Sequence, residues 1–199
     1  MESYKQKIKK MRIIAGKYKK INLNQTIDKS IRPLKDSAKE GIFNVLTHSA
    51  KLLFNFQDSK VLDLFSGTGS FGLECISRGS ANVTFVEKNP MALKNLHANI
   101  KKLKVEKISN VYQDDVFHLL KNKNFLKKKT DLIYLDPPFK EDKILEIFQC
   151  LIRQNNFSSK TLIVFHRNKA DSISFNSYKC IETKIYGNSK ILFGNILSL

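Results

Sequence analysis

From residue 61 onward, short apolar runs alternate with longer amphipathic stretches along the chain. The short runs predict strands, of which the third has the weakest pattern; they cover residues 61–65, 82–86, 108–112, 132–135 and 161–165. The longer stretches predict helices; they run from the glycine-rich turn to residue 78, and over residues 90–103, 116–120 and 142–154. This alternation predicts a parallel sheet that is covered by helices on both faces.

The two ends of the chain have patterns of their own. Residues 12–15 and 18–23 predict two short strands around a turn at Gly16-Lys17. Residues 179–197 predict two strands that meet at Gly187-Asn188 and add antiparallel character to one sheet edge. Near the start, Asp36 can cap a helix whose apolar residues form one stripe, namely Ile42, Phe43, Leu46, Ala50 and Leu53. Residues 167–178 remain unassigned.

These elements fit a single α/β unit. A chain of 199 residues with 42% hydrophobic content has room for one such domain and for no second large one. We therefore expect a Rossmann-like, seven-stranded, mostly parallel sheet with an N-terminal β-hairpin extension. Residues 1–31 would form a basic tail and hairpin, and residues 32–199 the sheet domain.

The charge of the chain is strongly positive and suggests a polyanionic partner. Lys and Arg number 35 against 18 Asp and Glu, for a formal net charge of +17. The first twenty residues hold eight basic residues and one Glu, which makes a local net charge of +7. The charge alone fits either nucleic acid or an anionic membrane as this partner. However, 30 of the 35 basic residues are Lys, which an A+T-rich genome also favours, so charge alone does not locate a contact surface.

Several other classes do not fit this composition. No apolar run approaches the roughly 18 residues of a membrane-spanning helix, so we expect no membrane association. The lysine-rich opening lacks the apolar core of a secretory signal. The cysteines at 75, 150 and 180 have no metal-ligand spacing and fit a reducing, cytoplasmic setting.

A glycine-rich segment after the strand at 61–65 is the first candidate for chemistry. Asp63 precedes Gly67-x-Gly69-x-x-Gly72, and Glu87 ends the next strand twenty residues after Gly67. Glycines allow a ligand to approach the backbone closely, and an acid after the second strand can bind ribose hydroxyls. This pattern fits both nicotinamide dinucleotides and S-adenosylmethionine. Asp63 favours S-adenosylmethionine, because its carboxylate suits an ammonium group and would repel a pyrophosphate.

A second candidate is Asp136-Pro137-Pro138-Phe139, which directly follows the strand at 132–135. Ligands of open α/β sheets bind beyond the carboxyl ends of strands, so this segment would share a crevice with the glycine loop. The prolines make the backbone extended and rigid. The Asp136 carboxylate and the Pro137 carbonyl could then accept both hydrogens of an exocyclic amino group, while Phe139 stacks on the base.

This arrangement predicts methyl transfer from a sulfonium to the amine of a base by in-line displacement. Acceptors on the amine hydrogens make the nitrogen more nucleophilic and stabilise the positive charge that develops on it. Asp136 could also take the released proton. The reaction requires no metal ion.

With these motifs, the chain resembles the bacterial small-subunit ribosomal RNA guanine-N2 methyltransferases of the RsmD type. The resemblance extends from Met11 over nearly the whole chain. Its stretches are Met11 to Tyr18, Arg32-Pro33 with Glu40 and Phe43-Asn44, Asp63 to Glu74, Asp136 to Phe139, and Tyr186 to Lys190. The resemblance implies a class I S-adenosylmethionine-dependent methyltransferase that acts on one guanine of 16S ribosomal RNA in the assembling small subunit. Separately, we expect the protein to be a monomer.

The resemblance also implies roles for single residues. The cofactor would be bound by Asp63, Phe65, Gly67, Thr68, Gly69, Glu87, Lys88, Asp115 and Val116. The target guanine would be held by Asp136, Pro137, Pro138 and Phe139. RNA would be contacted by Lys17, Lys19, Lys20, Arg32 and Lys35.

The chain departs from the family pattern at several positions. Leu34 replaces a usual Thr, and Ser37 and Lys39 stand where the family has Arg, which weakens the expectation of RNA contacts from this helix. The segment Phe165-His166-Arg167 replaces a more acidic one, and it is assigned no role. His48, His97, His118 and His166 are scattered and are interpreted as surface or core residues rather than catalytic ones.

Three alternatives remain open from the sequence. The first is DNA adenine-N6 methylation, which uses a similar motif but usually needs a large target-recognition domain. The second is a non-catalytic RNA-binding assembly factor, against which the intact Asp136 and Glu87 argue. The third is a nicotinamide dehydrogenase.

Overall fold

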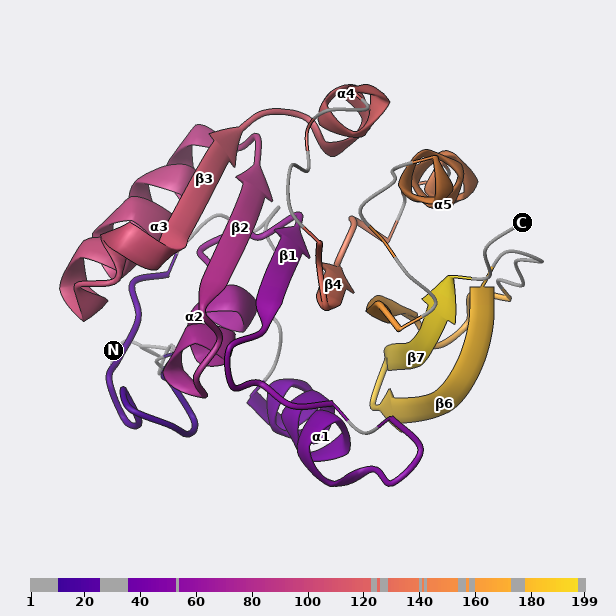
Figure 1. Cartoon of the computed structure of the whole chain (residues 1–199), viewed down its shortest axis with the longest axis horizontal. Helices are drawn as coiled ribbons and strands as arrows, with labels where there is room; N and C mark the ends of the chain where they lie inside the picture. The colour runs from indigo at the N-terminus through magenta and orange to yellow at the C-terminus, as the bar shows by residue number, and fades with distance from the viewer. Residues whose placement is uncertain are drawn as a thin grey trace, which may run out of the picture.

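The structure, a computed structural model, describes residues 11–25, 36–52, 54–122, 125, 129–139, 141, 143–153, 157, 160–172 and 178–196. Its centre is one seven-stranded sheet in the order β3-β2-β1-β4-β5-β7-β6 (Figure 1). The strands are β1 (Lys60–Leu64), β2 (Asn82–Glu87), β3 (Ser109–Gln113), β4 (Leu132–Leu135), β5 (Leu162–Asn168), β6 (Tyr178–Tyr186) and β7 (Ser189–Ile196). The first five are parallel, and β7 pairs antiparallel with both β5 and β6. The predicted mostly parallel seven-stranded sheet is confirmed.

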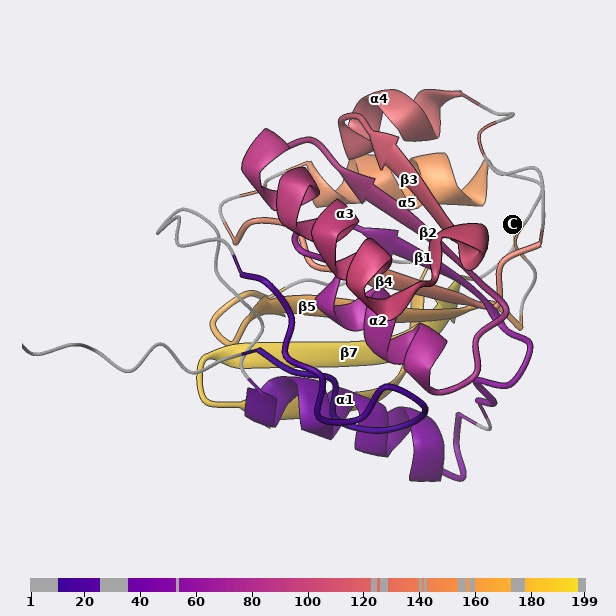
Figure 2. The same ribbon diagram turned by 90° about the vertical axis from the view of Figure 1, so that its left-hand side faces the viewer.

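Helices cover both faces of this sheet (Figure 2). They are α1 (Asp36–His48), α2 (Ser70–Ser77), α3 (Pro90–Leu103), α4 (Val116–Lys121) and α5 (Ile144–Ile152), with a short 3₁₀ turn at Glu106–Ile108. The first three helices share one apolar core with alternate strand residues such as Val61 and Val164. Helices α4 and α5 share the second core with the intervening residues, such as Leu62 and Ile163. None of the described helices is long and apolar enough to cross a membrane.

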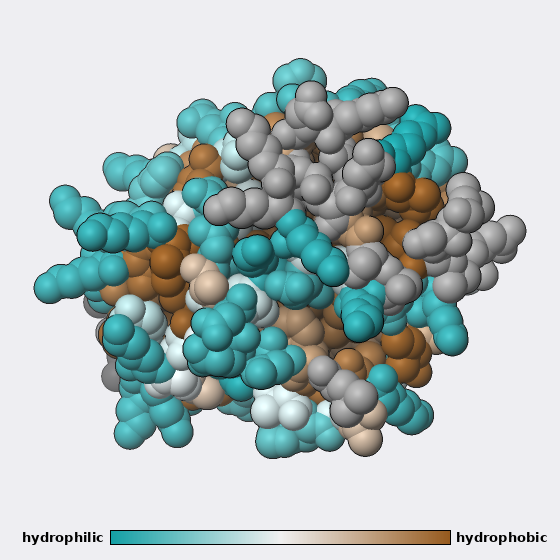
Figure 3. Space-filling view, viewed as in Figure 1, coloured by the Kyte–Doolittle hydropathy of each residue, from teal (hydrophilic) through white to brown (hydrophobic). Residues whose placement is uncertain are grey.

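Local signals in the sequence explain where α3 begins and ends. The Asn89 side chain accepts hydrogen bonds from the amides of Met91 and Ala92, and Pro90 occupies the first turn. Lys104 ends the helix in the left-handed conformation, at φ 55°. Long hydrophilic side chains project from the edge of the molecule where α3 lies (Figure 3).

Two helix predictions were too long. Helix α1 ends at His48, so Ala50 lies outside it and is exposed, while Leu53 lies outside the described residues. Helix α5 spans Ile144–Ile152 rather than residues 142–154, of which 142 and 154 are outside the described residues.

The predicted N-terminal strands are wrong as strands, although their antiparallel pairing is present. An isolated bridge joins Arg12 to Asn22, and the amide of Ile13 donates to the carbonyl of Ile21 at 3.0 Å. We call residues 11–25 the N-terminal arm. Its apolar residues Met11 and Ile13 belong to the core that α1, α2 and α3 share. The arm is thus packed onto the sheet domain instead of extending away from it.

Helix α2 holds the arm through two buried polar side chains. The Glu74 carboxylate accepts hydrogen bonds from the amides of Ile14 and Ala15, at 2.7 and 3.0 Å. The Ser77 hydroxyl donates to the carbonyl of Ala15. At Gly16, which has φ 78°, a Cβ would lie only 1.8 Å from the Ser77 carbonyl oxygen, so only glycine allows this approach.

Candidate active site

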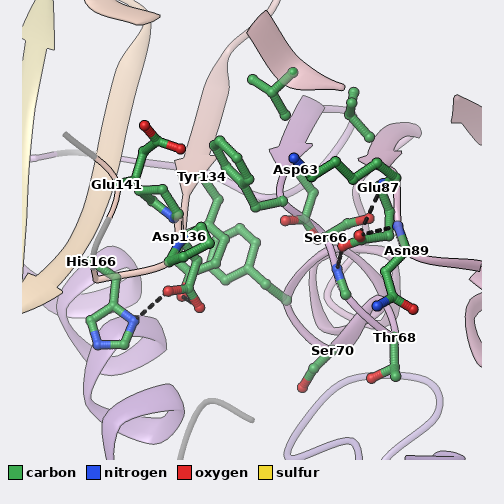
Figure 4. A pocket seen from close by; sticks show the side chains of 18 of the residues that line it. Asp63, Ser66, Thr68, Ser70, Glu87, Asn89, Tyr134, Asp136, Glu141 and His166 are labelled. Atoms are coloured by element: carbon green, nitrogen blue, oxygen red, sulfur yellow. Dashed lines mark hydrogen bonds and ion pairs between the residues drawn. The ribbon is translucent and has the colours of Figure 1, made fainter. Parts of the chain in front are cut away.

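A cavity of about 520 Å³ opens at the carboxyl ends of β1, β2 and β4. Its walls come from the glycine loop that follows β1, from the end of β2, and from the Asp136–Phe139 segment that follows β4. Figure 4 shows these groups facing one another, with Glu87 on one side and Asp136 with His166 on the other. The parallel order β2-β1-β4 therefore brings both candidate motifs to one crevice, as predicted from the sequence.

Asp63 lies at the base of the cavity and is almost completely buried. Its Oδ2 accepts a hydrogen bond from the amide of Gly72 at 3.0 Å, while Oδ1 has no partner among the described residues. Burial raises the pKa of Asp63 well above its usual range; the Gly72 amide opposes this shift, and the nearby Asp136 and Glu87 add to it. An ammonium group would satisfy both the charge and the orphaned oxygen of this side chain.

Glu87 fixes the glycine loop from the end of β2. Its Oε2 accepts from the amide of Gly67 at 2.8 Å, and its Oε1 accepts from the amides of Lys88 and Asn89 at 2.9 and 2.8 Å. Gly67 has φ 55°, and a Cβ there would meet no protein atom within 4 Å. The loop is therefore pre-formed by hydrogen bonds and leaves open space beside the cavity for a ligand.

Most of the predicted cofactor residues line this cavity, but two do not. The lining includes Asp63, Phe65, Gly67, Thr68, Glu87, Lys88 and Val116. Gly69 is not among the described lining residues; it adopts φ 83° at the start of α2 and packs against Leu96. Asp115 is also absent from the lining, because it caps α4 through the Phe117 amide and pairs with Lys88. Its neighbour Asp114 occupies the wall instead.

The Asp136–Phe139 segment forms the opposite wall, and all four of its residues line the cavity. The Asp136 carboxylate accepts from the hydroxyl of Tyr134 at 3.3 Å. Burial, followed by the charges of Asp136 and Asp63, raises the pKa of Tyr134 well above its usual range. Tyr134 therefore remains a protonated donor, and its ring stacks on Phe71 with centroids 3.9 Å apart.

Two residues at the end of β5 also belong to the site, and the sequence interpretation missed both. His166 is buried, and its Nδ1 lies 2.8 Å from Oδ1 of Asp136. Arg167 is also buried and donates to the carbonyls of Pro138 and Phe139 at 3.2 and 3.0 Å. A signal for His166 was available: Asp136 and His166 are the first polar residues after the apolar runs of two neighbouring strands.

The predicted RNA-contacting residues lie apart from this cavity or outside the described residues. Lys17, Lys19 and Lys20 are exposed on the arm, whereas Arg32 and Lys35 are not among the described residues. Lys39 is fully buried, and its Nζ donates to the carbonyl of Arg12 and to the Ser70 hydroxyl. Burial lowers the pKa of Lys39, although Glu74 opposes this shift. Lys39 thus fastens α1 to the arm and is unavailable to RNA.

Asn99 of α3 links the same arm to the cofactor loop. Its Nδ2 donates to the carbonyls of Asn24 and Thr68, and its Oδ1 accepts from the amide of Asn24. Met11 and Gln25, at the two ends of the arm, line the cavity. Within the described residues, no group of three or more His, Cys, Asp or Glu side chains could hold a metal ion.

The sheet order, the cavity and its two motifs define the fold of the class I S-adenosylmethionine-dependent methyltransferases. A solved structure from Escherichia coli, described as the methyltransferase yhhF, has the same fold. It superposes with a TM-score of 0.81 at 22% identity, over 96% of this chain and 100% of that one. The predicted fold class is confirmed.

The chain belongs to the protein family described as Conserved hypothetical protein 95, whose model matches residues 11–195. A Buchnera aphidicola relative named ribosomal RNA small subunit methyltransferase D is 31% identical over 159 residues, or 80% of this chain and 76% of the relative. A Bacillus subtilis relative, named as the rRNA methyltransferase YlbH, is 35% identical over 136 residues, or 67% of this chain and 70% of the relative. The expected RsmD-like family is therefore confirmed.

Proposed function

We propose that this protein transfers a methyl group from S-adenosylmethionine to the exocyclic N2 amine of a guanine in 16S ribosomal RNA. The observation that carries this proposal is the cavity that joins a cationic-ligand site around Asp63 to the acceptor pair at Asp136 and Pro137. The names of the relatives support small-subunit ribosomal RNA as the substrate. The guanine-N2 target is supported by the Asp136–Phe139 motif and by the family resemblance.

The charge of the cavity favours S-adenosylmethionine over a nicotinamide dinucleotide. Although the protein carries a net charge of +17, the described carboxylates that line the cavity are Asp63, Glu87, Asp114, Asp136 and Glu141, against one Lys. S-adenosylmethionine carries an ammonium and a sulfonium, both cationic, whereas a dinucleotide would bring a pyrophosphate among five carboxylates. The Ser66 hydroxyl, which has no hydrogen-bond partner among the described residues, offers a further polar contact at the same wall.

Each wall of the cavity has its own task in this mechanism. S-adenosylmethionine supplies the methyl group, which is bonded to its sulfonium sulfur. The amine nitrogen of the base forms a bond to the methyl carbon, and the electron pair of the broken carbon–sulfur bond stays on sulfur. Asp136 and the carbonyl of Pro137 accept the two N–H groups of the base, which orients the nitrogen lone pair and stabilises the growing positive charge. Phe139 lines the same wall and would stack on the base. Asp136 then accepts the proton that the methylated amine releases.

The arm is proposed to contact the RNA outside the cavity. In this proposal residues 1–31 form a positively charged extension, and residues 32–199 form the methyltransferase domain. The protein acts as a monomer on the assembling small subunit. Replacing Lys17, Lys19 and Lys20 with Ser should weaken RNA binding and flatten its dependence on salt, with a slope smaller by about 0.7–0.9 for each phosphate that the arm no longer neutralises. Affinity for S-adenosylmethionine should stay unchanged. An unaltered salt slope, measured by fluorescence anisotropy, would contradict the RNA-binding role of the arm.

Labelled S-adenosylmethionine tests the substrate class directly. The protein should methylate unmethylated small subunits, or their 16S RNA, and leave duplex DNA unlabelled. Label in DNA adenine would establish the alternative DNA activity, and no label with retained RNA binding would establish a non-catalytic assembly factor. Binding of NAD in place of S-adenosylmethionine in calorimetry would indicate a dehydrogenase. We also propose a cytoplasmic location, which suits three free thiols, at Cys75, Cys150 and Cys180.

A further inference from the structure

Of the contacts that Asp136 makes, the one from β5 is the shortest. The Nδ1 atom of His166 lies 2.8 Å from Oδ1 of Asp136, an ordinary hydrogen-bond length. The hydroxyl of Tyr134, at 3.3 Å from Oδ2, is a longer and weaker donor. Because Pro137 follows Asp136, the backbone at Asp136 is held extended, but its side chain can still rotate. His166 therefore has the strongest influence on where this carboxylate points.

Strand register explains why this histidine meets this aspartate. Leu135 of β4 pairs with Phe165 of β5 in parallel register, so the next residues along both strands, Asp136 and His166, are neighbours. Side chains alternate between the faces of a strand, and Val164, two residues before His166, packs in the core beneath α1, α2 and α3. The contact is thus built into the sheet, and Figure 4 shows the His166 ring beside the Asp136 carboxylate.

The surroundings of the ring determine which nitrogen carries its proton. The Nε2 atom of His166 is buried and has no hydrogen-bond partner among the described residues. A proton on Nε2 would leave a buried N–H donor unsatisfied, which costs about 1–3 kcal/mol, whereas a lone pair there costs less. A proton on Nδ1 makes a hydrogen bond, because Nδ1 faces a carboxylate oxygen of Asp136. The favoured form is the neutral ring with Nδ1–H donating to Asp136.

We propose that His166 is a positioning residue for methyl transfer. It orients Asp136 as one of the two acceptors, beside the Pro137 carbonyl, for the amine of the target base. A neutral donor fixes the direction of the carboxylate and leaves its negative charge uncancelled, so that charge remains available to the developing cation. The same ring meets Phe139 edge to face, with centroids 5.4 Å apart and planes at 84°. His166 thus contacts two of the residues proposed to hold the base, and it acts on the reaction through Asp136. This inference rests on the proposed function for the identity of that base.

Single-turnover methylation at saturating cofactor and RNA tests the proposal with His166→Leu and His166→Asn. Leu fills similar space but cannot donate, whereas Asn places an N–H close to the position of Nδ1. We expect His166→Leu to lower the rate about 10- to 100-fold, because a small misplacement of a catalytic group has an effect of this size. The affinity for S-adenosylmethionine should not change. His166→Asn should restore most of the rate.

A double-mutant comparison separates positioning from a purely structural role. In an Asp136→Ala background, His166→Leu should cause no further loss of rate, because its effect passes through the missing carboxylate. The proposal would be overturned if His166→Leu lowered the rate in the Asp136→Ala background by the same factor as it does alone. An unchanged rate for His166→Leu alone would also overturn it, as would equal losses of rate for His166→Leu and His166→Asn.

Nitrogen NMR of the free enzyme gives a readout that needs no RNA and no activity. Long-range ¹H–¹⁵N correlation should show the His166 ring as the neutral tautomer with the proton on Nδ1. A proton on Nε2 would overturn the inference. If the tautomer is as expected but the methyl group appears on another nucleotide, the proposed substrate fails while the role of His166 stands.

Discussion

The two walls of the cavity are held in different ways. On the cofactor wall, carboxylates accept hydrogen bonds from backbone amides: Asp63 from Gly72, and Glu87 from Gly67. On the opposite wall, side chains from β5 hold the Asp136–Phe139 segment: His166 contacts Asp136, and Arg167 contacts the carbonyls beyond it. The first wall is fixed by β1, the glycine loop and α2, together with the end of β2. The second wall depends on the pairing of β4 with β5. Changes on each wall should therefore separate cofactor binding from chemistry.

The largest expected effect is on chemistry. Asp136→Ala removes the proposed acceptor that would stabilise the developing positive charge, so the methyl-transfer rate should fall by about 100- to 1,000-fold. The affinity for S-adenosylmethionine should stay close to that of the wild type, because the Asp63 wall is intact. Single-turnover rates and calorimetry measure the two quantities separately. A variant that loses cofactor affinity as severely as rate would show that the two walls do not act independently.

Asp63→Asn should have the opposite profile. This variant loses the proposed charged hydrogen bond to the cofactor ammonium, so affinity should fall by about 10- to 100-fold, measured by calorimetry. Because burial raises the pKa of Asp63 in the folded state, its contribution to stability is present at low pH and is lost as pH rises above the ordinary carboxyl range. At neutral pH the ligand-free Asn variant should therefore melt at a higher temperature than the wild type. A lower melting temperature would contradict this account.

The same titration predicts a pH dependence of cofactor binding. The ammonium group of the cofactor favours the ionised form of Asp63. At pH values where Asp63 is protonated in the free protein, cofactor binding therefore releases a proton. Affinity should therefore increase with pH up to the raised pKa of Asp63. In Asp63→Asn this increase in affinity with pH should be absent. If the wild type and Asp63→Asn had the same pH profile, the increase would belong to the titration of another group.

Two glycines of the cofactor loop offer a smaller and finer comparison. Gly67→Ala and Gly69→Ala both place alanine at positive φ, with an expected loss of about 1–2 kcal/mol in the free energy of unfolding. At Gly69 the new methyl would also lie 2.4 Å from the buried Leu96, so this variant should be the less stable one in denaturant titrations. At Gly67 the methyl meets no protein atom and stands beside the cavity. Gly67→Ala should therefore lower cofactor affinity more than Gly69→Ala does. Equal losses of affinity would place Gly69 at the ligand after all.

The contrast between the walls also explains how much the sequence could reveal. The Pro90–Leu103 helix and the Leu132–Leu135 strand were predicted to the residue, because caps, proline and apolar runs are local signals. Asp63, Glu87 and Asp136 were predicted as site residues from signals of the same local kind, since each stands at a fixed place within or after a strand, and all three line the cavity. His166 lies thirty residues from Asp136; its position after an apolar run was a local signal, but its contact with Asp136 follows from the pairing of β4 with β5.

The N-terminal arm shows the other limit of local patterns. Ile13 and Ile14 are β-branched residues typical of a strand, yet the amides of Ile14 and Ala15 donate to the buried Glu74 of α2. A helix side chain thus takes hydrogen bonds that a partner strand would otherwise take. Lys39 likewise reads as a surface charge in the sequence, but the approach of the arm to α1 buries it. These outcomes depend on tertiary packing, which overrides local preference.

Nucleoside analysis of the methylated RNA is the most direct test of the central claim, that one cavity brings the methyl donor to the exocyclic amine of a guanine. Small subunits that lack the modification should be incubated with wild-type protein and isotopically labelled S-adenosylmethionine, digested to nucleosides and analysed by mass spectrometry. The account predicts label in N2-methylguanosine, and its near absence when Asp136→Ala replaces the wild type. Label in any other nucleoside, or an equal yield from Asp136→Ala, would contradict it.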